Sequence, residues 1–172
     1  MVAIIGVILV VVLGGYVAAA ALSEPVGPPV EIPEVLSVHP LSGWVFAGRG
    51  TFDGFRYVAL TRGSGNLVAG VAAGATDAAG LADAYVEVVL SGQLSQLSVS
   101  RREDIQLLSG ARGIRFGYVG VVADTSGSVE GEVTVVMSPA GHGIVFDGWA
   151  PAGLLAFVRS DIRTMIDRTE VT

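Results

Sequence analysis

Residues 1–22 form an uninterrupted apolar stretch without a charged side chain. A helix of that length reaches roughly 33 Å, at about 1.5 Å per residue, and a bilayer's hydrocarbon core is about 30 Å thick. Inside lipid, a helix satisfies its own backbone hydrogen bonds. The stretch therefore predicts one transmembrane helix that anchors the protein to the bilayer.

A cleaved signal peptide is the alternative interpretation of this stretch, because residues 18–21 contain an A-x-A pattern. The stretch is longer than the usual apolar region of about 7–15 residues, and no basic residue precedes it, so we expect the anchor to be retained. Glu24, Glu31 and Glu34 follow it, and the first arginine is Arg49. Arg49 is too distant to hold the C-terminal side of the helix in the cytoplasm, so elimination predicts a single-pass protein of the cell membrane with an extracytoplasmic domain.

Small residues recur at four-residue spacing within the predicted membrane helix: Gly14 with Ala18, and Gly15 with Ala19. Such a surface allows a second helix to approach closely. An ordinary lipid-facing helix rich in alanine and glycine is the alternative. We expect the bilayer as one partner and a membrane protein as another.

Residues 23–40 contain five of the seven prolines. Proline lacks an N–H group and fixes φ, so it interrupts both helices and central strands. The segment is therefore predicted to be an extended, polyproline-like linker between the anchor and a folded domain of residues 41–172.

Short apolar runs bounded by glycine and polar turns predict strands within residues 41–172. The runs lie at residues 44–46, 55–61, 67–73, 97–108, 114–122, 129–137 and 144–146. In the run at 114–122, alternation places Phe116 and Tyr118 on one face and Arg115 on the other. Strands in consecutive runs favour an antiparallel sheet.

Two segments have helical periodicity. After the N-cap candidates Thr76 and Asp77, apolar residues repeat at helical spacing and predict a helix at about 77–91. Pro151 suits the first turn of a second helix. The apolar stripe of that helix comprises Leu154, Leu155, Val158, Ile162, Met165 and Ile166. The predicted fold is α+β, an antiparallel sheet with two packed helices, preceded by one N-terminal transmembrane helix.

Composition removes several kinds of chemistry. The chain is 51% hydrophobic and 15% charged, its ten basic residues are all arginine, and it has no cysteine. It can therefore form no lysine Schiff base, disulfide, catalytic thiolate or acylated lipoprotein anchor. A net charge of −6 with scattered arginines argues against a nucleic-acid partner. Arginine without lysine, beside many glycines, is typical of a GC-rich genome such as an actinobacterial one.

Candidate catalytic and metal-binding groups are isolated. His39 and His142 have no further ligand at a suitable spacing, and a zinc site normally needs three or four. Glu130 and Glu132 share a strand face about 7 Å apart, which invites comparison with the carboxylate pair of glycosidases. Without other cleft residues, we interpret them as polar positions on an outer face. We expect no metal, no cofactor and no enzymatic activity, and a hydrolase is the weakest hypothesis.

Two features are candidates for a partner surface. Arg101, Arg102, Arg112 and Arg115 lie on segments that can be adjacent in the sheet, where they would suit an acidic partner or lipid headgroups. A solvated sheet edge is the simpler interpretation. Trp149 is either an exposed anchor for a partner or, as is commoner for tryptophan, part of the core.

Three segments of the chain resemble the PsbP-like fold family. Residues 40–44 (Pro-Leu-Ser-Gly-Trp) resemble the opening of its first strand, and residues 65–73 its following hairpin. Residues 146–151 (Phe-Asp-Gly-Trp-Ala-Pro), with 162–171, resemble its closing strand and helix. The resemblance extends over roughly residues 38–171. It implies a binding or assembly domain without a catalytic set, here a bacterial envelope member in which a membrane helix replaces the acylated cysteine of lipoprotein members.

These observations lead to two functional hypotheses. The first is a membrane-anchored extracytoplasmic binding or assembly module, an accessory subunit of a larger envelope complex such as a respiratory or secretion assembly. The second is a periplasmic carrier that holds a lipid or other small apolar ligand between the sheet and the helices.

Overall fold

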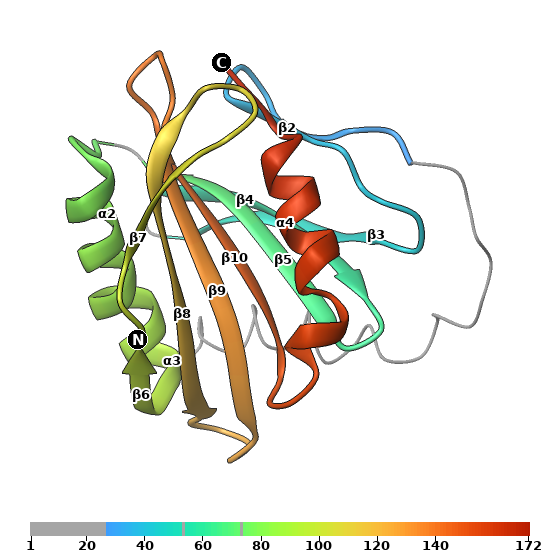
Figure 1. Ribbon diagram of the computed structural model, residues 1–172, viewed down its shortest axis with the longest axis vertical. Helices are drawn as coiled ribbons and strands as arrows, with labels where there is room; N and C mark the ends of the chain where they lie inside the picture. Colours follow the sequence, from blue (N-terminus) through green and yellow to red (C-terminus); the bar gives the residue numbers. More distant parts are fainter. Residues whose placement is uncertain (1–26, 53, 73) are drawn as a thin grey trace.

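The computed structural model describes residues 27–172 apart from positions 53 and 73 (Figure 1). The predicted membrane helix at residues 1–22, with Gly14, Gly15, Ala18 and Ala19, lies outside the described residues. Over the range that is described, no helix is both long and apolar enough to span a membrane.

An eight-stranded antiparallel sheet forms the centre of the domain, in the order β3-β4-β5-β10-β9-β8-β6, with β7 paired to β8. Its strands are β3 (Val45–Phe52), β4 (Phe55–Arg62), β5 (Gly65–Ala72), β6 (Leu94–Val99), β7 (Glu103–Gln106), β8 (Arg112–Val122), β9 (Ser128–Met137) and β10 (Gly143–Pro151). The central position of β10 follows from its pairing with β5 on one side and β9 on the other. The predicted antiparallel sheet is confirmed.

One face of the sheet carries the first predicted helix. It is continuous from α2 (Ala78–Ala84) through the π-helical segment η2 (Tyr85–Leu90) to α3 (Ser91–Gln93). Asp77 caps its N-terminus, where its side chain accepts a hydrogen bond of 2.8 Å from the N–H of Gly80. Ala82, Tyr85 and Leu90 pack on Phe116 and other strand residues of this face to form one apolar core.

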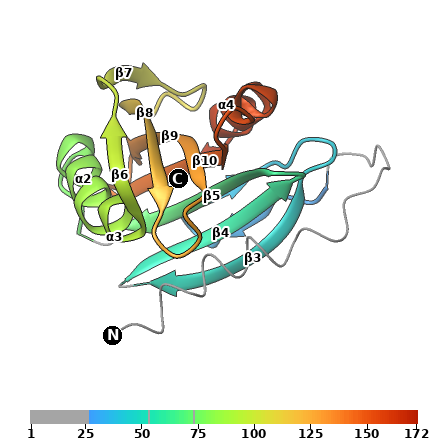
Figure 2. The same ribbon diagram turned by 90° about the horizontal axis from the view of Figure 1, so that it is seen from below.

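The opposite face of the sheet carries α4 (Arg159–Asp167), which follows a short 3₁₀ turn, η3 (Leu155–Phe157). Figure 2 shows the two helical segments on opposite sides of the twisted sheet. Ile162, Met165 and Ile166 of α4 are buried in a second core, which also contains Leu60 and Phe146. The predicted α+β class with two packed helices is confirmed for the described residues.

The predicted linker is wrong for residues 30–38. Here β1 (Val30–Ile32) pairs with β2 (Leu36–Val38), and the C-terminal β11 (Glu170–Val171) completes a three-stranded sheet. The prolines do not interrupt these strands, since Pro33 lies in the turn between them. Alternate apolar residues enter the second core, and Val38 is fully buried. The folded domain therefore begins by residue 30 and not at 41.

Two local predictions also need correction. The expected single strand at 97–108 is divided into β6 and β7, which pair with successive parts of β8 and are separated by an irregular stretch at residues 100–102. Pro151 does not start a helix but ends β10, opposite Val129 of β9. Helical structure starts later, so Leu154 lies outside the buried stripe and is 39% exposed.

Candidate functional site

A small pocket lies between the helical segment 78–93 and the sheet, on the face that carries the first core. Its volume is about 70 Å³. Aliphatic side chains make up much of its wall, and Gln93 is its one amide. Six of the lining residues are aromatic and one is acidic: Phe52, Phe55, Tyr57, Tyr85, Tyr118, Trp149 and Asp147. The ring centroids of Phe55 and Tyr85 are 6.3 Å apart, within the range of favourable aromatic contacts.

Asp147 is the only acidic group among the described residues that line the pocket, and both of its oxygens accept hydrogen bonds. Tyr85 of η2 donates its hydroxyl to Oδ2 at 2.8 Å, and Tyr118 of β8 donates to Oδ1 at 2.9 Å. All three side chains are buried. Among the described residues, no arginine or histidine forms an ion pair with this carboxylate.

Burial governs the protonation of these three groups. Loss of hydration raises the pKa of Asp147 to about 6, although the two tyrosine hydrogen bonds act in the opposite direction. Burial, and then the nearby charge of Asp147, hold the pKa of Tyr85 and of Tyr118 well above their ordinary value of 10. Near neutral pH, the pocket therefore contains a carboxylate held by two neutral phenol donors.

Glycines in the strands make room for the aromatic rings. In the sheet register, Tyr118 lies opposite Gly131, and Gly131 lies opposite Trp149. A Cβ atom at Gly131 would overlap the Tyr118 ring, so this position must be glycine for the ring to cross β9 toward Asp147. Gly70 similarly leaves space for the ring of Phe55. Glycines beneath the aromatic rings therefore leave the space that these rings occupy in the pocket wall.

The helix changes its geometry where it meets the pocket. Within η2, Tyr85 and Leu90 are buried and Val89 is half-buried, and all three line the pocket. Ser91 follows this segment and donates its hydroxyl to the carbonyl of Val86 at 2.9 Å. π-Helical turns are uncommon and occur frequently at functional sites. This observation independently directs attention to the same pocket.

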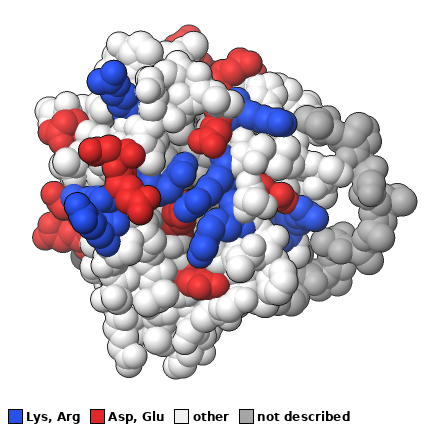
Figure 3. Space-filling model, viewed as in Figure 1, with Lys and Arg blue, Asp and Glu red and all other residues white. Residues whose placement is uncertain are grey.

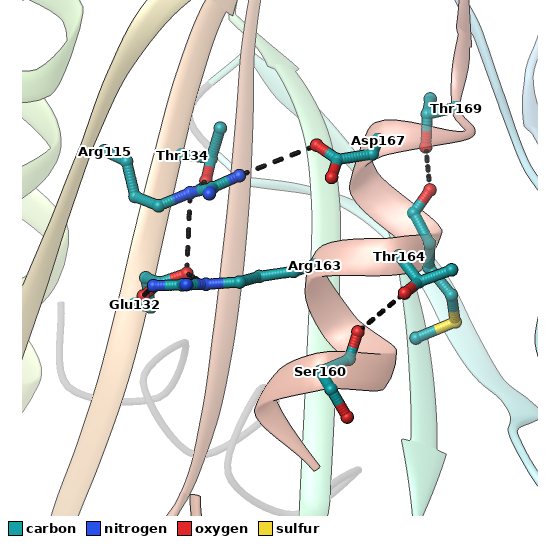
Figure 4. A network of polar contacts seen from close by, with 9 residues as sticks. Arg115, Glu132, Thr134, Ser160, Arg163, Thr164, Asp167 and Thr169 are labelled. Carbon is teal, nitrogen blue, oxygen red and sulfur yellow. Dashed lines mark hydrogen bonds and ion pairs between the residues drawn. The ribbon is translucent and has the colours of Figure 1, made fainter. Parts of the chain in front are cut away.

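A separate polar network connects the other face of the sheet to α4 (Figure 4). Arg163 of α4 pairs with Glu132 of β9 through two nitrogens, one of which lies 2.7 Å from Oε1. This contact raises the pKa of Arg163. Arg115 of β8 lies 3.5 Å from the same carboxylate and donates to Thr134 Oγ1 at 2.9 Å. Its Nη2 has no hydrogen-bond partner and lies 3.8 Å from Asp167.

Glu130 and Glu132 share one face of β9, as their spacing predicts, and both hold the C-terminal segment on the sheet. Glu130 Oε1 accepts hydrogen bonds of 2.9 Å from the backbone N–H groups of Gly153 and Leu155. Glu132 is occupied by Arg163 and Arg115. Both carboxylates therefore have a structural role, because they attach the C-terminal segment to the sheet.

The four candidate arginines do not meet in one patch. Arg102 lies 5.6 Å from the Phe116 ring on the pocket side of the sheet and pairs with Asp83. Arg115 points to the α4 side. Arg101 and Arg112 are exposed. Figure 3 shows basic and acidic side chains intermixed on the face that carries α4, and not a uniformly basic surface.

Trp149 is half-buried and forms part of the pocket wall. It packs against the first core and lines the same pocket as Asp147, two residues before it on β10. Sequence reasoning singled out Trp149 but missed Asp147, Tyr85 and Tyr118. The available signal was a lone acidic residue in the otherwise uncharged run of β10.

An open groove of about 280 Å³ lies on the α4 side, where Val119, Glu130, Leu155 and Arg159 contribute to its walls. Val119 is 49% exposed there, although β8 is an inner strand flanked by β9 and β6. The groove therefore combines apolar surface with charged groups at its sides.

No cluster of three or more potential metal ligands occurs in the described part of the chain. His39 lies 3.5 Å from Glu170 of β11, and His142 is half-buried in the turn before β10. The two histidines are thus in different parts of the domain.

The fold is similar to two solved structures. Cyanobacterial PsbP (CyanoP) from Synechocystis aligns with a TM-score of 0.62 and 15% identity, over 90% of this chain and 99% of that chain. A Pseudomonas aeruginosa protein of unknown function aligns with a TM-score of 0.51 and 10% identity, over 83% of this chain and 96% of that one. Comparison with family models and with curated proteins finds no match. The protein has a PsbP-like fold, as the resemblance in its sequence indicated.

Proposed function

We propose that the protein is a membrane-anchored extracytoplasmic binding domain whose pocket receives a small, largely apolar ligand. The observation that carries this proposal is the pocket between η2 and the sheet, with its aromatic walls and its buried Asp147. Ligand sites are typically concave, mostly apolar and equipped with few polar groups that fix orientation. Of the two hypotheses from the sequence, this observation favours the small-ligand carrier.

The size of the pocket limits the ligand. A volume of about 70 Å³ is well below the range of roughly 300–1,000 Å³ for drug-sized ligands. The pocket therefore suits a compact molecule or the end group of a longer one. The half-buried rings of Phe52 and Trp149 supply apolar surface for the part of the ligand nearest to solvent.

The remaining parts of the proposal rest on the sequence. Residues 1–22 would hold the domain at the outer side of a bacterial membrane, and the arginine-only composition would fit a GC-rich, actinobacterial source. A domain anchored in this way meets ligands that move between the envelope and the bilayer.

The test uses 3,3-dimethyl-1-butanol, a compact branched alcohol, and the full chain in a maltoside detergent. We expect saturable binding by titration calorimetry. The variant Val89→Trp fills the pocket from η2 and should weaken this binding at least about tenfold. The variant Val88→Trp is the control, because Val88 is 57% exposed and does not line the pocket. Equal binding by both variants would contradict the proposal.

A second candidate function is docking to a membrane-protein partner through the groove beside α4. The exposed Val119, between the charged groups of the groove, favours it. Protein interfaces commonly combine an apolar centre with a polar rim. Val119→Asp should remove such a partner from complexes isolated in mild detergent. Leu108→Asp, at a site that is 80% exposed and outside the groove, should retain it.

A further inference from the structure

The charge within the pocket restricts its ligand further. Of the described residues that line the pocket, Asp147 alone has an ionisable carboxyl group, and it is buried without a cationic partner among these residues. A buried charge is costly unless it is paired, and the two phenol hydrogen bonds compensate it only in part. Arg102, which lies on this face of the sheet, is already engaged with Asp83 and Phe116.

The walls of the pocket complement the same charge. Its aromatic rings have electron-rich faces, which attract a cation within about 6 Å of the ring centre. Tyr85 and Tyr118 direct their hydroxyl hydrogens at Asp147, so their oxygens present electron pairs away from it. The carboxylate of Asp147 and the phenol oxygens of Tyr85 and Tyr118 therefore favour positive charge on the ligand.

We propose that the pocket recognises an alkylammonium group, with Asp147 as its counter-ion and the surrounding aromatic rings as its cage. The ligand class is a compact organic cation whose carbon substituents are apolar, such as a quaternary ammonium head group. This inference rests on the proposed small-ligand function and specifies its chemistry. The ammonium charge would replace the missing ionic partner of the carboxylate, and its alkyl groups would contact the rings.

The decisive comparison uses choline and 3,3-dimethyl-1-butanol, which have the same shape but differ in one charge. Both are titrated by calorimetry into the full chain in maltoside, a detergent without an ammonium group. We expect choline to bind at least about tenfold more tightly than the alcohol. Equal or tighter binding of the alcohol would overturn the ammonium assignment and leave the small-ligand function intact. Absence of binding by both compounds would overturn both proposals.

Two variants distinguish the contribution of the carboxylate to choline binding from that of the aromatic rings. Asp147→Asn keeps the size of the side chain and removes its charge, so choline binding should fall at least about tenfold while alcohol binding changes less than about twofold. Trp149→Leu keeps an apolar wall but removes an aromatic ring. It should therefore weaken the binding of choline more than the binding of the alcohol. If Asp147→Asn does not fold, the Trp149→Leu comparison decides. Equal effects of Trp149→Leu on both compounds would then contradict the assignment.

Discussion

The ring of Tyr118 lies across Gly131 of the neighbouring strand, and its hydroxyl reaches Asp147 one strand further along the sheet. One aromatic side chain thus spans three strands on the pocket side. Its position depends on the missing Cβ at residue 131, because a methyl group there would overlap the ring. This contact connects the packing of the sheet to the placement of the buried carboxylate.

Gly131→Ala should destabilise the domain by about 1–3 kcal/mol, because the Tyr118 ring must move out of a packed position. The same shift should break its hydrogen bond to Asp147. Chemical denaturation measures the first effect. Gly117→Ala is a matched control in β8, where an added Cβ would lie 3.6 Å from its nearest neighbour, an ordinary contact. Equal destabilisation by both variants would show that strand glycines matter for a reason other than ring contact.

The stability of the domain should change with pH as Asp147 loses its proton. Its folded pKa of about 6 lies above the ordinary value of 3.8, so the folded protein binds this proton more tightly than the unfolded chain. The contribution of this group to stability is therefore greatest below about pH 4, falls as the pH rises to about 6, and then levels off. Its size is on the order of 3 kcal/mol.

Asp147→Asn should remove the pH-dependent contribution of Asp147 to stability. As the pH rises from 4 to 7, the unfolding free energy of the variant should therefore increase relative to that of the wild type. Denaturant titrations at several pH values measure it. Tyr85→Phe deletes a hydrogen bond that lowers the pKa of Asp147, and should extend the decline to higher pH. A difference that is constant with pH would contradict the assigned titration.

Glu132→Gln should destabilise the domain by about 3–5 kcal/mol, because Arg115 and Arg163 lose the carboxylate between them in a largely buried site. The loss should loosen α4 from the sheet, and amide hydrogen exchange of residues 159–167 should accelerate. Glu31→Gln is the control, since Glu31 is exposed and takes part in none of the ion pairs of the described residues. An unchanged exchange rate in α4 would show that its apolar side alone holds it.

Membrane attachment should depend on the apolar character of residues 1–22. Replacing Val10 and Val11 together by aspartate should prevent insertion or release the domain, because each acidic group costs about 2.5–3.5 kcal/mol at the centre of a membrane helix. Separation of membrane and soluble fractions measures the result. The double substitution Val10→Leu with Val11→Leu preserves hydrophobicity and should remain in the membrane. Retention of the aspartate variant would argue against a bilayer helix.

Local patterns in the sequence determined much of the architecture. Alternation in β8 correctly placed Phe116 and Tyr118 opposite Arg115, because successive side chains of a strand point to opposite faces. Helical spacing after Asp77 located the helix against the first core. Proline content misled at residues 30–38, because Val30 and Val38 are buried in a core built with residues that are distant in the sequence.

The pocket was decided by tertiary structure alone. Asp147 is separated by 62 positions from Tyr85 and by 29 from Tyr118, so no motif at fixed spacing can record their contact. The sequence determined which faces are apolar, since periodicity expresses burial residue by residue. Only the pairing of β8, β9 and β10, and the helix laid over them, brought one carboxylate and two phenols together, because that convergence depends on strand order and on the room that Gly131 leaves.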